Sequence, residues 1–190
     1  MIDLDKVRSN FPSLSLKDDN ENQIIYLDGP GGTQVPSSVI DAISNYYRQS
    51  NSNTHGEFIT SKETDSIMDS MREKVAQLLG AESKECISIG QNMTTLNYSL
   101  SRGLSKIFKK GDEVIITELD HEANRGPWKT LESYGIKLVE VALLQDGTLD
   151  YNDFKNKINK RTALVAMGMS SNALGTINDF NFIKKITAKY

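Results

Sequence analysis

Short apolar segments alternate with amphipathic segments through the second half of the chain, and this alternation limits the fold more than any other feature. The apolar segments predicted to be strands are 86–89, 114–117, 137–143 and 163–167. The segments with apolar residues at helical spacing are 94–108, 127–134, 151–158 and 179–190. Alternating strands and helices favour a mostly parallel sheet covered on both faces. We therefore expect a three-layer α/β/α fold.

The first half of the chain is predicted to be mainly helical. The elements expected there are a helix at 5–10, a polar loop at 17–23, a strand at 24–27 and helices that begin near 37 and 60. Thr60 and Glu63 have the spacing of a capping box, and Gly80 is placed to end the second long helix. We divide the chain into an N-terminal helix and arm at 1–23 and the N-terminal part of one large domain at 24–190.

Composition excludes several classes of protein. The 190 residues carry a formal net charge of −3, which gives no basic surface for nucleic acid. The acidic start lacks the apolar core of a signal peptide, and the longest apolar stretch is far shorter than the ~20 residues of a membrane span. The single cysteine, Cys86, is predicted to be a buried thiol, and no histidine has the spacing of a metal site. We expect a cytoplasmic protein that binds neither nucleic acid nor membrane.

Ligands of parallel α/β folds bind beyond the carboxyl ends of the strands, so the loops that follow strands are the informative ones. The loop at 90–95 lies between a predicted strand and a helix N-terminus, where free N–H groups bind anions. Thr94 and Thr95 add hydroxyl groups, which favours a phosphate. The alternative is that one of these threonines only caps the helix.

Each of the other three loops also has two interpretations. His121 follows the strand at 114–117 and could stack on an aromatic ligand or move a proton, or it could simply be solvated. Asn172 follows the strand at 163–167 and offers an amide, or makes an ordinary Asx-turn before Gly175. Gly31 lies in a glycine-rich turn that allows close approach to a ligand, or forms a plain reverse turn.

The order and spacing of these loops are more specific than each loop alone. The combination resembles the class V aminotransferases, the pyridoxal-phosphate family that includes cysteine desulfurases. The segments that carry the resemblance are 26–36 (YLDGPGGTQVP), 93–95 (MTT), 120–124 (DHEAN) with Pro127-Trp128, 147–150 (GTLD), 161–162 (RT) and 171–176 (SNALGT). The similarity extends over almost the whole chain and implies the large domain of the fold-type I transferases.

The resemblance also implies roles for individual residues. Thr94 and Thr95 would hold the phosphate of pyridoxal 5'-phosphate. His121 would stack on the pyridine ring and assist proton transfer, and Asn172 would lie beside the ring's phenolic oxygen and the substrate carboxylate. Gly31 would border the pocket of a small amino-acid substrate. Relatives of this kind are homodimers, so a homodimer is expected.

Several family features are absent from these 190 residues. The family's Asn-x-His-Arg-Gly segment appears as Asn53-Thr54-His55-Gly56, and Leu96 stands where a glutamate often follows the two threonines. No Ser-x-His-Lys segment, which carries the Schiff-base lysine, is present, and the aspartate that pairs with the pyridine nitrogen would follow a later strand. We expect the chain to be the N-terminal part of the enzyme and inactive alone. The alternative is a stand-alone module that binds a nucleotide or phosphate.

Overall fold

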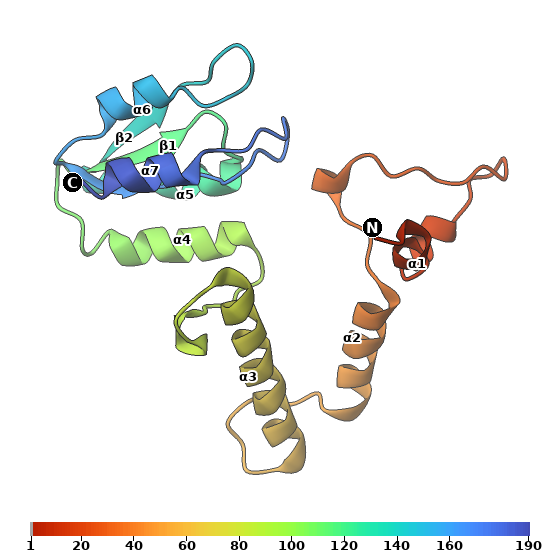
Figure 1. The fold of residues 1–190 in the computed structure, drawn as a ribbon. Helices are drawn as coiled ribbons and strands as arrows, with labels where there is room; N and C mark the ends of the chain where they lie inside the picture. The colour runs from red at the N-terminus through yellow and green to blue at the C-terminus, as the bar shows by residue number, and fades with distance from the viewer. Residues whose placement is uncertain (1) are drawn as a thin grey trace. The chain divides into compact units, whose positions relative to one another are not determined.

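The structure is a computed structural model that describes residues 2–190. The chain divides into two compact units, Met1–Ser88 and Ile89–Tyr190, and each is described by itself (Figure 1). Among residues 2–190, no helix has the length and apolar character needed to cross a membrane.

A parallel sheet forms the centre of the second unit. Its strands are β1 (Glu113–Thr117), β2 (Lys137–Val141) and β3 (Thr162–Val165), in the order β2-β1-β3. Both neighbours run parallel to β1, which is buried along its whole length. The predicted strands at 114–117, 137–143 and 163–167 are therefore confirmed, with shorter ends for the last two. Because the strands are parallel, their carboxyl ends lie at one edge of the sheet.

Helices cover both faces of this sheet, as predicted. They are α4 (Met93–Leu104), α5 (Gly126–Lys129), α6 (Tyr151–Lys157) and α7 (Phe180–Thr187), with short 3₁₀ turns η4 (Glu122–Asn124) and η5 (Thr130–Tyr134). Val114 and Ile116 of β1 pack with Trp128 of α5 on one face. Ile115 packs with Phe154 of α6 and Ile183 of α7 on the other face. Alternate residues of one strand thus supply two separate cores.

The first unit consists of helices and extended segments. Its elements are α1 (Leu4–Arg8), η1 (Pro12–Ser15), η2 (Gly29–Gly31), α2 (Ser37–Gln49), α3 (Ile59–Leu79) and η3 (Lys84–Cys86). Gly80 ends α3 in the left-handed conformation at φ 66°, as its position predicted. The capping box is wrong: Phe58 precedes the helix without a side-chain cap, and Glu63 instead accepts a hydrogen bond from Ser50.

Two predicted strands are wrong for a shared reason. Residues 24–27 are extended but not part of a strand, and Ile25 and Leu27 are 77% and 91% exposed. Residues 86–89 are not a strand either, because Cys86 ends η3 and is exposed rather than buried. A short apolar run becomes a strand only when a neighbouring strand takes its backbone groups. Among residues 2–190 these two segments have no such neighbour.

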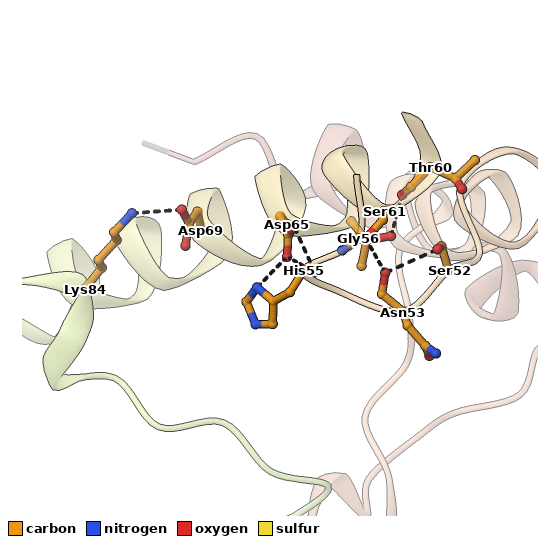
Figure 2. Close-up of polar contacts among 10 residues, drawn as sticks. Ser52, Asn53, His55, Gly56, Thr60, Ser61, Asp65, Asp69 and Lys84 are labelled. Atoms are coloured by element: carbon orange, nitrogen blue, oxygen red, sulfur yellow. Dashed lines mark hydrogen bonds and ion pairs between the residues drawn. The ribbon is translucent and has the colours of Figure 1, made fainter. Parts of the chain in front are cut away.

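The loop between α2 and α3 is held by side chains of α3 (Figure 2). The buried Ser61 hydroxyl donates to the carbonyl of Asn53 at 2.6 Å and accepts the N–H of Gly56 at 2.7 Å. The carboxylate of Asp65 accepts the backbone N–H of His55 at 3.0 Å, with the imidazole Nδ1 3.5 Å away. His55 takes the left-handed backbone conformation, φ 66°, which is uncommon outside glycine. These bonds fix the loop without a hydrophobic core.

Candidate functional site

Two threonines at the start of α4 do not cap the helix. Asn92 is the N-cap: its backbone is extended, and its Oδ1 accepts the N–H of Thr95 at 2.9 Å. This contradicts the alternative in which Thr94 or Thr95 caps the helix. Both threonines are exposed, and their hydroxyls have no hydrogen-bond partner among residues 2–190. A helix N-terminus with two free hydroxyls suits a phosphate.

His121 lies in the turn that follows β1. Its backbone is extended at φ −60° and ψ 151°, and it precedes η4. The imidazole Nδ1 accepts the N–H of Ala123 at 3.1 Å. A nitrogen that accepts a hydrogen bond carries no proton, so the proton of the neutral ring lies on Nε2. The exposed imidazole therefore has a fixed tautomer and one free donor.

Asn172 lies on a tight turn that Ser171, not Asn172, stabilises. The Ser171 hydroxyl accepts the N–H groups of Ala173 and Leu174 at 3.2 and 3.1 Å. Gly175 takes φ 73° and donates its N–H to the carbonyl of Ser171 at 3.1 Å. The Asx-turn alternative for Asn172 is thus wrong. Asn172 is exposed, and its amide has no partner within the described part of the chain.

Hydrogen bonds join these turns to one another. Asn97 of α4 donates to the carbonyl of Ala123 at 3.0 Å and reaches Oδ1 of Asn124 at 3.3 Å. The same Asn124 oxygen accepts the indole N–H of the buried Trp128 at 3.1 Å. Asp120 accepts the N–H of Gly168, just beyond β3, at 2.7 Å. The segments that carry Thr94, Thr95, His121 and Asn172 therefore form one connected edge of the second unit.

Gly31 belongs to the first unit. Its N–H donates to Oδ1 of Asp28 at 3.2 Å, and a Cβ atom at this position would lie 2.6 Å from the other Asp28 oxygen. A side chain at this position would displace the carboxylate of Asp28. A hollow of about 380 Å³ lies beside the turn; it is lined by Val7, Arg8, Phe11, Leu14, Tyr26, Gly29, Gly32, Thr33 and Gln34. A place for Gly31 at a substrate pocket stays a prediction.

Sequence reasoning missed the residues that hold this site together. Asn92, Asn97, Asp120 and Asn124 were not singled out. Asn92 could have been found, because asparagine before a helix is a preferred N-cap. The bonds that join Asn97, Asp120 and Asn124 to other segments span 26 to 48 residues in the sequence, and no local pattern reveals them.

Comparison with known proteins identifies the family. The family model described as Aminotransferase class-V matches residues 25–190. The chain belongs to this family. Family members use pyridoxal phosphate as their cofactor, and the predicted resemblance is confirmed.

Several of the relatives and solved structures that match are named cysteine desulfurases. A probable cysteine desulfurase of Vibrio cholerae is 35% identical over 179 residues, which are 93% of this chain and 44% of the relative. One of Halobacterium salinarum is 32% identical, with 93% and 43% covered. The apo structure of cysteine desulfurase from Thermococcus onnurineus is 31% identical with a TM-score of 0.87, and the match covers all of this chain and 46% of that one. The chain thus spans less than half the length of these relatives.

The residues on the connected edge fit the chemistry of pyridoxal phosphate. A phosphate needs donors, and the free threonine hydroxyls at the start of α4 supply them. An aromatic ring needs a flat face, and the exposed His121 imidazole supplies one. A phenolic oxygen or a carboxylate needs a donor, and the unpartnered Asn172 amide supplies one. The fit concerns the type of group at each position.

Proposed function

We propose that this chain supplies the phosphate-binding part of a pyridoxal-phosphate enzyme of the cysteine desulfurase type, acting on a small amino acid. The observation that carries the proposal is the connected edge, where exposed hydroxyls at the start of α4 are joined to segments that carry an exposed imidazole and an exposed amide. The names of the similar proteins support the reaction type. The stand-alone nucleotide module is not favoured, because the family match covers the same turns.

Each residue has a task that its surroundings support. Thr94 and Thr95 bind and orient the phosphate with hydroxyl and backbone donors. His121 covers one face of the ring and holds a proton on Nε2, because Nδ1 is occupied by the N–H of Ala123. Asn172 donates to an oxygen of the ring or of the substrate, and Gly31 borders the substrate. When bound, the cofactor withdraws electrons from the substrate's Cα.

Cofactor binding by the 190-residue chain tests the first task. We expect weak binding of pyridoxal phosphate, measured by fluorescence titration, because the phosphate donors are present and the lysine is not. The double variant Thr94→Ala/Thr95→Ala should lose this binding. The matched control is Ser37→Ala/Ser38→Ala, which removes two adjacent hydroxyls from the first turn of α2 and should leave binding unchanged. Tight binding of ATP without a response to pyridoxal phosphate would overturn the proposal.

Turnover by the same chain tests the division of the active site. We expect no sulfide release from cysteine, because no Ser-x-His-Lys segment lies in these residues and the covalent route needs that lysine. Borohydride reduction in the presence of pyridoxal phosphate should label no single lysine stoichiometrically. Robust turnover with one labelled lysine would show that the family's catalytic positions have been assigned wrongly.

The proposal extends to the assembly and location of the whole protein. We propose a homodimer in the cytoplasm, as the family resemblance implies. Its support in this chain is the number of large apolar side chains that α2 and α3 leave exposed, such as Ile43 and Leu78. Sedimentation of the whole protein tests this directly, since a monomer at micromolar concentration contradicts it.

A further inference from the structure

Asp120 accepts more hydrogen bonds than any other carboxylate on the connected edge. Its Oδ2 accepts the hydroxyl of Thr117 at 2.6 Å. Its Oδ1 accepts the amide of Asn124 at 2.9 Å and the backbone N–H of Gly168 at 2.7 Å. A carboxylate offers only acceptors, and here it faces only donors. The first two bonds lie within the turn after β1, whereas the third crosses to the segment after β3.

Gly168, which donates its N–H to Asp120, is also held through its carbonyl. The carbonyl of Gly168 accepts the amide of the buried Asn178 at 2.7 Å, and the Asn178 N–H donates to Met169 at 2.8 Å. Asn178 closes the loop that begins at Gly168, and Asn172 lies on that loop. Asp120 and Asn178 therefore hold the two peptide groups that flank Gly168, and these bonds fix the base of the Asn172 loop.

The other end of this chain of contacts reaches the core. Asn124, which donates to Asp120, accepts the indole N–H of Trp128, and Trp128 packs against β1. Asp120 is also the residue immediately before His121. A rigid frame thus runs from the buried indole to Asp120 and across to Gly168, with His121 on one side and Asn172 on the other.

Gly168 shows how close the two segments lie. A Cβ atom there would lie 3.0 Å from Oδ1 of Asp120 and 3.4 Å from the carbonyl of Ser170. The approach that allows the Gly168–Asp120 hydrogen bond thus leaves little room for a side chain.

We propose that Asp120 is a positioning residue that locks the turn carrying His121 to the loop carrying Asn172. The lock would fix the distance between the two side chains, so that His121 meets the ring of the cofactor while Asn172 meets its oxygen. The proposal rests on the proposed function for the identity of the ligand. The lock itself rests on the hydrogen bonds of Asp120 alone.

Hydrogen exchange in the full 190-residue chain tests the lock. Asp120→Ala should speed exchange of the Gly168 amide and of the 168–178 loop about tenfold or more, because a hydrogen bond to a charged acceptor is lost. The matched control is Asp146→Ala, since Asp146 accepts two hydrogen bonds from Thr148 within its own turn. It should leave the Gly168 amide unchanged. Unchanged exchange in Asp120→Ala would overturn the proposal.

Two further variants test the lock in case Asp120→Ala fails to fold. Asp120→Asn can keep Oδ1 for Gly168 and Asn124 while its amide donates to the Thr117 hydroxyl, so it should restore most of the protection. Gly168→Ala should loosen the loop by crowding Oδ1, and Asp120→Ala should relieve that crowding. We therefore expect the effects of Gly168→Ala and Asp120→Ala to be non-additive. Additive effects would contradict direct contact between the two positions.

Induced circular dichroism of bound pyridoxal phosphate tests whether the lock serves the cofactor. At saturating cofactor, Asp120→Ala should reduce the signal at least threefold, Asp120→Asn should largely restore it, and Asp146→Ala should not change it. Faster loop exchange with an unchanged signal would reduce Asp120 to a structural residue and overturn the proposal. If the unchanged chain binds no pyridoxal phosphate, the proposed function fails, and the exchange experiment decides the lock by itself.

Discussion

Different interactions stabilise the inside of each of the two units. In Ile89–Tyr190 a parallel sheet separates two hydrophobic cores, and β1 is entirely buried. Within 2–88, by contrast, Ala76 is the only buried apolar side chain. The fixed points there are the buried hydroxyls of Ser61 and Thr64, which bind backbone groups of the α2–α3 loop.

This difference teaches how each unit depends on the rest of a protein. The second unit buries two apolar cores between its own elements, although it too leaves side chains such as Ile107 and Ile177 exposed. The long helices of the first unit leave apolar side chains in solvent, with Ile43 55% and Leu78 82% exposed. Hydrogen bonds between neighbouring segments set local shape, but their net contribution is about 0.5–1.5 kcal/mol each. We therefore expect the second unit to carry most of the free energy of unfolding.

The largest expected effect comes from a matched pair of leucines. Leu131 is fully buried in the second unit and Leu78 is exposed in the first. Leu131→Ala should lower the free energy of unfolding by about 3–5 kcal/mol, because it leaves a cavity in a packed core. Leu78→Ala should change it by less than about 0.5 kcal/mol. Urea denaturation followed by circular dichroism measures both, and equal losses would break the comparison.

A hydroxyl in the first unit should have an intermediate effect. Ser61→Ala leaves the Asn53 carbonyl and the Gly56 N–H without their partner, which costs about 1–3 kcal/mol. The loss should be local, so exchange of the Gly56 amide should rise while β1 stays protected. Ser66→Ala, at an exposed position of α3, is the control. Opening of both units together would show that they are coupled more strongly than we infer.

The smallest expected effect concerns Lys84, whose pKa is raised by the hydrogen bond from its ammonium group to Asp69 at 3.0 Å (Figure 2). Asp69→Asn should lower the pKa of Lys84, whereas Glu82→Gln should leave it almost unchanged. Because the folded pKa is raised, the stabilisation is complete below the unfolded pKa of about 10.4 and is lost as pH rises through the folded pKa. NMR titration of the lysine measures the shift. An unchanged pKa of Lys84 in Asp69→Asn would show that the hydrogen bond to Asp69 does not stabilise the first unit.

Sequence patterns predicted the second unit better than the first, because hydrophobic patterns report the burial of apolar side chains. The alternation at 113–167 reports burial on two faces, and the structure supplies both faces within the unit. The apolar runs at 24–27 and 86–89 resemble strands equally well. Within residues 2–190 no strand pairs with them, and hydrophobic period alone does not say which strand pairs with which.

For the candidate site, residue type was predictable and connection was not. Thr94, His121 and Asn172 could be chosen because they follow predicted strands in the order of a known family. The bonds of Asn92 and Ser171 reach only two or three residues along the chain, but nothing local showed that Asp120 reaches Gly168. Such contacts depend on strand order, which is a property of the whole sheet.

The hydrogen bond between Asp120 and Gly168 joins groups that are 48 residues apart in the sequence. A ribosome adding about 5–20 residues per second synthesises Gly168 roughly 2–10 s after Asp120. During that interval the Asp120 carboxylate can bind only its nearby donors, Thr117 and Asn124. Asn178, which donates to the carbonyl of the same residue, Gly168, is made later still. The connected edge is therefore completed late in translation of this unit, after β1 and β2 have both been made.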